Sequence, residues 1–204
     1  VVAAGTDFVM VPKIESAEQM LQVAEAIESA RQKCGSTATV KALAIIETPL
    51  GIENAYAIAS ASKTLHGILL GAEDFTASMG AQRTAEGAEI AYARSRLLTA
   101  CKAAGVLAID TPFPFVSDLE GLEKDAAFAV QLGFDGKAVI SPHHVHRVNQ
   151  AFMPAPDKVN WARRVMETAR KASEEGKGAV SLDGMMIDLP IIKRAERILL
   201  LADA

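Results

Sequence analysis

The sequence predicts an α/β fold built on a parallel sheet. Short apolar runs such as 42–46 and 67–70 carry no charge, which is typical of strands that are buried on both faces. The segments between such runs have helical patterns that begin at capping residues or end at glycines. Strand and helix alternate five times, and parallel strands joined by right-handed crossovers are the expected result.

The expected elements follow one another in a simple order. We predict five strands, at 8–13, 42–47, 67–70, 106–110 and 137–142. Helices are expected from Ser16, where Ser16 and Gln19 fit a capping box, and then at 54–62, 88–104, 117–133 and 143–151. The fourth of these also begins with a capping-box pattern, formed by Ser117 and Glu120. Residues 75–80 are small or polar for the most part, and we expect a loop there that lines a site.

The segment Pro154-Ala155-Pro156 interrupts this alternation. Two prolines so close together indicate a stiff connector. Beyond it, helices are predicted at about 158–174 and 190–201, with a short mixed segment at 179–186 between them. The chain is therefore expected to divide into a barrel-like part, 1–153, and a C-terminal helical part, 157–204.

Composition limits the classes of function. The 204 residues are 50% hydrophobic, which is enough for one sizeable domain, and the net charge of −4 argues against a nucleic-acid partner. No apolar run approaches about 18 residues, so no membrane span is expected. The first residues do not resemble a signal peptide, and Cys34 and Cys101 fit helical patterns far apart. We interpret the two cysteines as reduced structural thiols of a cytoplasmic protein.

Two carboxylates follow neighbouring strands and are the strongest candidates for chemistry. Glu47 ends one predicted strand and Asp74 follows the next, so both would lie at the same edge of the sheet. Carboxylate oxygens and water suit Mg²⁺. The alternative is that both are solvated loop acids or helix caps. The side chain of Glu73 should point away from that of Asp74, which favours a supporting or structural role.

Other polar residues at this edge are weaker candidates. Lys13 and Glu15 end the first strand and could line the site or form a surface pair before a helix. Asp110 ends the fourth strand, where it could contact substrate or cap a helix. The histidines at 143, 144 and 146 resemble a metal cluster, but helical spacing spreads them around the helix, and we favour that interpretation.

Six short motifs together resemble a known family. They are Val11-Pro12-Lys13-Ile14-Glu15-Ser16, Ile46-Glu47-Thr48-Pro49, Leu70-Gly71-Ala72-Glu73-Asp74, Ile109-Asp110-Thr111, Gly133-Phe134-Asp135-Gly136-Lys137 and Asp183-Gly184-Met185-Met186-Ile187-Asp188-Leu189-Pro190. They occur in the same order in citrate lyase beta subunits and malyl-CoA lyases, within the HpcH/HpaI aldolase/citrate lyase superfamily. The resemblance covers essentially the whole chain.

The resemblance implies a fold, a cofactor and a reaction. It implies a TIM (β/α)₈ barrel, of which this sequence holds about five βα units, and Mg²⁺ held by Glu47 and Asp74. The reaction would be the reversible Claisen-type cleavage of a 3-hydroxy-acyl-CoA such as citryl-CoA or malyl-CoA. The substrate would lie against Lys13, Glu15, Gly71, Ala72, Glu73 and Asp110.

The resemblance also assigns a role to the C-terminal part. In malyl-CoA lyase-like proteins the residue that matches Asp188 belongs to a helical lid over a neighbouring subunit's active site. This implies a catalytic Asp188 and a homo-oligomer, trimer or hexamer, with the lid supplied in trans. Asp188 also precedes the helix begun by Pro190, so a helix N-cap is the simpler alternative.

The sequence departs from the family in ways that keep other functions open. Family members carry three more strands before the point where this chain starts, including an arginine that grips the substrate carboxylate. Ser141 stands where many relatives have His, and His144 where many have Gln. The alternatives are a malyl-CoA thioesterase and a non-catalytic acyl-CoA-binding subunit, and the sequence does not identify the acyl-CoA.

Overall fold

A computed structural model describes residues 2, 5–174 and 180–203. The chain divides into two compact units, Val1–Val148 and Asn149–Ala204. The division falls within a helix, whereas the sequence placed the connector at 154–156. Among the described residues, every helix is too short or too polar to cross a membrane.

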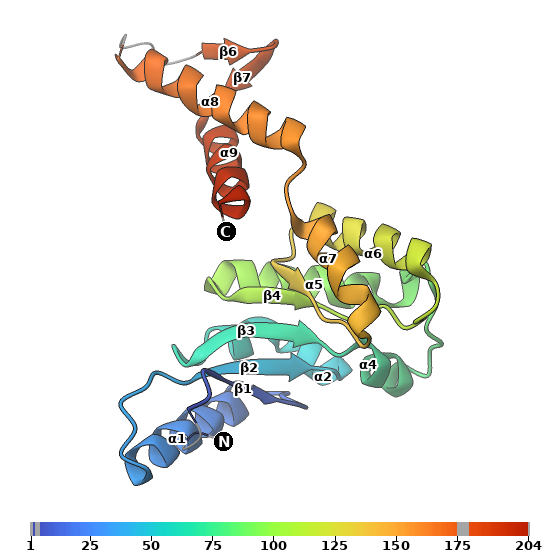
Figure 1. Ribbon diagram of the computed structural model, residues 1–204. Helices are drawn as coiled ribbons and strands as arrows, with labels where there is room; N and C mark the ends of the chain where they lie inside the picture. Colours follow the sequence, from blue (N-terminus) through green and yellow to red (C-terminus); the bar gives the residue numbers. More distant parts are fainter. Residues whose placement is uncertain (1, 3–4, 175–179, 204) are drawn as a thin grey trace. The chain divides into compact units, whose positions relative to one another are not determined.

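The first unit is organised around a five-stranded parallel sheet. Its strands are β1 (Phe8–Val11), β2 (Lys41–Ile46), β3 (Leu65–Leu70), β4 (Leu107–Asp110) and β5 (Gly136–Lys137). They lie side by side in chain order, as Figure 1 shows for β1 to β4, so β1 and β5 form the two edges. Because all strands are parallel, their carboxyl ends lie at the same end of the sheet, as predicted.

Helices connect successive strands of this unit, and the last helix follows β5 and continues into the second unit. They are α1 (Ala17–Lys33), α2 (Pro49–Glu53), α3 (Ala55–Ala59), α4 (Ala72–Met79), the 3₁₀ helix η2 (Ala88–Ile90), α5 (Ala91–Ala104), α6 (Leu119–Leu132) and α7 (Pro142–Phe152). The predicted capping box of Ser16 and Gln19 is confirmed. Gly105 and Gly133 end α5 and α6 with positive φ angles of 74° and 107°, as their positions suggested.

Four local predictions were wrong. Residues 75–79 belong to α4 and do not form a loop, and the hydroxyls of Thr76 and Ser78 donate to carbonyls one turn back within that helix. Asp118, rather than Ser117, caps α6 through the Gly121 amide. The helix expected at 54–62 is shorter, as α3, and the separate helix α2 precedes it. The fifth strand is only the short β5, because the chain turns away toward α7 beyond it.

The core of the first unit lies between the sheet and its helices. Alternate residues of β2 are fully buried, namely Ala42, Ala44 and Ile46. Ile68 and Leu70 of β3 are also fully buried. Close packing of this core limits the movement of the strand ends that carry the acidic residues.

The second unit has its own small core. Helix α8 (Pro156–Glu174), the hairpin β6 (Val180–Leu182) and β7 (Met185–Ile187), and helix α9 (Leu189–Ala202) surround buried Ala162, Val165, Ile187 and Ala195. The hairpin replaces the mixed segment expected near 179–186; residues 175–179 lie outside the described residues. Asp183 and Gly184 form its turn with φ angles of 51° and 80°, and positive φ at both residues is typical of the type I′ turn of two-residue hairpins.

Candidate active site

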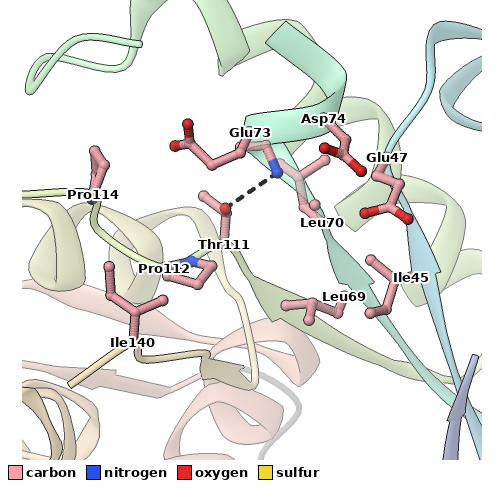
Figure 2. A pocket seen from close by; sticks show the side chains of 12 residues that line it. Ile45, Glu47, Leu69, Leu70, Glu73, Asp74, Thr111, Pro112, Pro114 and Ile140 are labelled. Atoms are coloured by element: carbon pink, nitrogen blue, oxygen red, sulfur yellow. Dashed lines mark hydrogen bonds between the residues drawn. The ribbon is translucent and has the colours of Figure 1, made fainter. Parts of the chain in front are cut away.

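A pocket of about 420 Å³ opens at the carboxyl ends of β2, β3 and β4. Figure 2 shows acidic side chains on one side and apolar ones on the other. The lining residues are Ile45, Glu47, Leu69, Leu70, Gly71, Ala72, Glu73, Asp74, Thr111, Pro112, Pro114 and Ile140. The pocket therefore combines oxygen ligands with a surface suited to an apolar part of a ligand.

Glu47 is held firmly at the end of β2. Its Oε1 accepts a hydrogen bond from the Lys13 amide at 3.0 Å, and the residue is only 9% exposed. Gly71 passes directly beside it. A Cβ atom on Gly71 would lie 2.5 Å from the Glu47 Cβ and 2.7 Å from its Oε2. Only glycine leaves room for the Glu47 side chain at this point.

Asp74 approaches Glu47 from the first turn of α4. The two carboxylates face one another in Figure 2. The Lys13 ammonium lies 3.7 Å from Asp74 Oδ2, and the two side chains are 69% and 54% exposed, so this ion pair is weak. Lys13 also has a left-handed backbone, with φ of 56°, which is uncommon outside glycine.

The electrostatics of this pair favour a cation. Burial raises the pKa of Glu47, and the neighbouring charge of Asp74 raises it further, while the amide and ammonium of Lys13 act in the opposite direction. Two carboxylates that repel one another and are only partly compensated can hold a divalent cation. Since both donors are hard oxygens beside an open pocket, the residues present fit Mg²⁺ with water completing its shell.

Glu73 points away from Asp74, as its place in the sequence suggested. Its Oε1 lies 3.1 Å from Arg83 Nε, and Arg83 also pairs with Glu89. Hydrogen bonds from Thr84 and Arg83 outweigh the effect of burial and lower the pKa of Glu89 to about 2. Glu73 thus links one side of the pocket to a second ionic cluster, in which the Arg83 guanidinium pairs with two carboxylates.

Asp110 lies at the end of β4 but outside the pocket lining. It is fully buried and accepts two hydrogen bonds from Arg94, each 2.9 Å long. Lys137 Nζ lies 2.8 Å from its Oδ2. Asp125 pairs with the same two cations, at 2.6 Å from Arg94 and 2.5 Å from Lys137. The expected contact between Asp110 and substrate does not fit this placement, because two cations already occupy its carboxylate.

The remaining candidates lie in different places. Glu15 precedes α1 and is not part of the pocket lining; its carbonyl accepts a hydrogen bond from Asn54 at 2.8 Å. Asp188 belongs to the second unit and caps α9 through the Ile191 amide at 3.2 Å. His144 is buried, with Nε2 3.0 Å from the Val116 carbonyl.

The described part of the chain contains no group of three or more His, Cys, Asp or Glu side chains placed to hold a metal. The histidines of α7 therefore do not form the cluster that their spacing resembled. As ligands, Glu47 and Asp74 would supply two carboxylates, a number that suits Mg²⁺ better than Zn²⁺.

Sequence reasoning missed the ionic cluster around Asp110. Arg94 and Asp125 lie within helices, where charged residues usually face solvent. A signal was nevertheless present. Arg94 is in helical phase with Leu97, Leu98 and Cys101, all of which are buried. A charged residue on an apolar stripe can be buried only with partners, and those partners come from other elements.

Comparisons with known proteins agree with this arrangement. Residues 1–142 match the family described as HpcH/HpaI aldolase/citrate lyase. The beta subunit of citrate lyase from Haemophilus influenzae is 46% identical over 98% of this chain and 69% of its own length. Human mitochondrial citramalyl-CoA lyase is 31% identical over 95% of this chain and 59% of its own length.

A solved structure is similar over nearly the whole chain. CitE from Mycobacterium tuberculosis, in complex with magnesium, acetoacetate and coenzyme A, is 34% identical and superposes with a TM-score of 0.79. The match covers 98% of this chain and 70% of that one. The predicted α/β fold class of the TIM-barrel type is confirmed. The chain spans about two thirds of the lengths of the bacterial protein chains it matches here.

Proposed function

This chain belongs to the HpcH/HpaI aldolase/citrate lyase family, and from that premise we propose that it is a Mg²⁺-dependent carbon–carbon lyase acting on a CoA thioester. The substrate class is a small 3-hydroxy acid linked to CoA, such as citryl-CoA or malyl-CoA. The observation that carries the proposal is the pair of facing carboxylates, Glu47 and Asp74, at the acidic side of the pocket.

Glu47 and Asp74 hold the cation. The raised pKa of Glu47 supports this assignment, since a nearby divalent charge would relieve the repulsion between the two carboxylates. The structure of the M. tuberculosis relative is a complex with magnesium. Bound Mg²⁺ supplies Lewis acidity toward the oxygen of the hydroxy or keto acid.

Lys13, which lies outside the pocket lining, and other residues within that lining bind and orient the substrate. Lys13 places a positive charge beside Asp74, where it can attract a substrate carboxylate. Gly71 and Ala72 bring the backbone close to the ligand, and Glu73 borders the opening. The apolar wall of Pro112, Pro114 and Ile140 excludes water from the far side of the pocket.

Asp188 carries the proton in this proposal. The enolate left by cleavage of the carbon–carbon bond takes a proton from the Asp188 carboxyl, and in the reverse direction the Asp188 carboxylate removes that proton from acetyl-CoA. The side chain would be supplied by a lid from a neighbouring subunit of a homo-oligomer. Asn keeps much of the capping ability at this position but cannot serve as a base.

Metal binding tests the central assignment. Calorimetry with MgCl₂ should show that Glu47→Ala and Asp74→Ala each weaken binding by about 100-fold or more, because Mg²⁺ depends on few charged protein ligands. Glu73→Ala is the matched control, since that neighbouring carboxylate points away. Equal Mg²⁺ affinity in the parent and in both variants would refute the assignment of Glu47 and Asp74 as metal ligands.

Product analysis tests the reaction. A lyase releases a keto acid and acetyl-CoA from malyl-CoA, whereas a thioesterase releases malate and free CoA. Binding of Mg²⁺ and acyl-CoA without turnover would indicate a non-catalytic subunit. In the full natural protein, Asp188→Asn should lower lyase turnover by about 100-fold and leave Mg²⁺ affinity unchanged. Turnover at the parental rate would reduce Asp188 to a helix cap.

A further inference from the structure

We propose that Lys137 and Thr111 are positioning residues for the metal ligand Asp74, connected to it through the start of α4. The proposal rests on the function proposed above and deepens it. The buried ionic cluster, defined as Arg94, Asp110, Asp125 and Lys137, anchors this connection on the side of β4.

The ionic cluster joins four elements that are far apart in the sequence. Arg94 comes from α5, Asp110 from β4, Asp125 from α6 and Lys137 from β5. All four side chains are 8% exposed or less. The two cations and two carboxylates balance, and their hydrogen bonds fix the geometry of each group. The end of β4 is therefore held by directional bonds as well as by apolar packing.

Lys137 extends this anchoring beyond the cluster. Its ammonium donates hydrogen bonds to Asp110 Oδ2 at 2.8 Å and to the Thr111 carbonyl at 2.6 Å, and it forms an ion pair with Asp125 at 2.5 Å. The Thr111 peptide is thus fixed relative to the buried charges.

Thr111 passes the constraint to α4. Its hydroxyl oxygen accepts a hydrogen bond from the Ala72 amide at 3.3 Å, a contact drawn as the dashed line in Figure 2. Ala72 is the first residue of α4, and the first amides of a helix need acceptors from outside it. The N-cap residue, Gly71, has no side chain to provide one. Thr111 does so from a neighbouring strand end.

The start of α4 is consequently held from two sides. The Gly71 amide donates to the Ile46 carbonyl at 2.9 Å, one residue before Glu47. The Ala72 amide is bound to Thr111 on the other side. Asp74 lies in the first turn that follows, so its distance from Glu47 depends on both bonds. The hydrogen bond from the Gly71 amide links the start of α4 to β2, the strand that precedes Glu47. The hydrogen bond from the Ala72 amide to Thr111 sets the orientation of α4 relative to that strand.

The first test compares two substitutions of Thr111. Thr111→Val keeps the shape but loses the acceptor for the Ala72 amide, whereas Thr111→Ser keeps the hydroxyl. We expect hydrogen exchange of the Ala72 amide, followed by NMR, to become about fivefold faster in Thr111→Val, as loss of one neutral hydrogen bond implies. Mg²⁺ affinity should fall by a similar factor. Thr111→Ser should stay close to the parent in both measurements.

The second test separates positioning from charge balance. Lys137→Met alone leaves a buried negative charge, so it should destabilise the fold. Adding Asp125→Asn restores neutrality, leaving Arg94 paired with Asp110, but does not restore the bond to the Thr111 carbonyl. We expect the double variant to regain stability while Mg²⁺ affinity stays about fivefold low. Lys124→Met, on the exposed face of α6, is the matched control.

The outcomes separate this inference from the proposed function. Parental exchange of Ala72 in Thr111→Val, equal damage in Thr111→Ser, or recovery of Mg²⁺ affinity in the double variant would each overturn the positioning role. If the parent protein binds no Mg²⁺, the proposed function fails, and the exchange rate of the Ala72 amide still decides whether Thr111 holds the start of α4.

Discussion

Glu47 and Asp110 are two carboxylates in equivalent positions with opposite surroundings. Each comes at the end of a central strand, and each is buried or nearly so. Asp110 is bound by the Arg94 guanidinium and the Lys137 ammonium. Glu47 has one backbone amide, another carboxylate and only the exposed Lys13 ammonium near it. Position on the sheet therefore does not decide the role of a strand-end acid; the charges around it do.

The comparison also explains how the two regions cooperate. A fully neutralised carboxylate is a structural element, because its charge is already compensated and its geometry is fixed. An under-compensated carboxylate at a pocket costs stability and is available to a cation. The neutralised acid, Asp110, lies on β4, and the neighbouring strand β3 leads into α4. Asp110 can therefore support Glu47 and Asp74, the two acids that remain available to a cation.

The largest expected effect on stability comes from removing the charge of Asp110, the neutralised carboxylate. Asp110→Asn leaves Arg94 and Lys137 buried with a single carboxylate between them, and unpaired buried charge costs about 3–5 kcal/mol. Urea denaturation should show a loss of that size in the free energy of unfolding. Glu120→Gln, which removes an exposed ion pair with Lys124, is the control and should change stability by less than about 1 kcal/mol. A loss below about 1 kcal/mol in Asp110→Asn would contradict this account of the cluster.

The next effect concerns Glu89, which has the opposite pKa shift to Glu47. Because the pKa of Glu89 is lowered to about 2, its charge stabilises the fold above its ordinary value near 4.5, and this contribution is lost as the pH falls toward 2. Glu89→Gln should cost about 1.5–3 kcal/mol at pH 7, the range for hydrogen bonds to a charged group. Thermal melts of parent and variant between pH 7 and 2 should converge on the acid side. A constant difference across that range would show that the charge is not responsible.

A somewhat smaller effect is expected where the backbone crosses Glu47. Gly71→Ala places a methyl group 2.5 Å from the Glu47 Cβ, and overpacking of this kind costs about 1–3 kcal/mol. Since Glu47 must move, Mg²⁺ affinity should fall together with stability. Calorimetry and denaturation on the same preparation measure both. Gly136→Ala is the matched control, because its nearest contact would be 3.4 Å, to the flexible end of Ile109. Unchanged Mg²⁺ affinity in Gly71→Ala would show that Glu47 is not confined by Gly71.

The smallest effect is expected from Glu47 itself in the absence of divalent cations. Since its pKa is raised, the folded state holds the proton more tightly, so stability falls as the pH rises from about 4.5 through the folded value. Glu47→Gln removes this cost and should leave the protein as stable or slightly more stable at pH 7, by up to about 1 kcal/mol. Denaturation in EDTA at pH 4 and pH 7 should show the variant gaining relative to the parent at the higher pH. If Glu47→Gln instead lost about 3 kcal/mol of stability, as expected for Asp110→Asn, the proposed difference between the two acids would be wrong.

The sequence by itself determined the features that depend on neighbouring residues. The alternation of strands and helices, the capping box at Ser16 and the glycines that end α5 and α6 follow from short-range rules, and the structure confirms them. The acidic pair could also be predicted from the sequence, because each carboxylate comes at or just after the end of an apolar strand. In a parallel sheet the carboxyl ends of the strands lie at the same end of the sheet, whatever the positions of the helices between them.

Only the tertiary structure decided which acids are free and which are neutralised. The partners of Asp110 lie 16 residues before it and 27 residues after it in the chain, and the Thr111–Ala72 contact spans 39 residues. No local pattern specifies such pairs, since the energy of a buried charge depends on every group that the fold places around it. The same reason separates Glu47 from Asp110: the two look alike along the chain and differ only in the charges that folding brings to them.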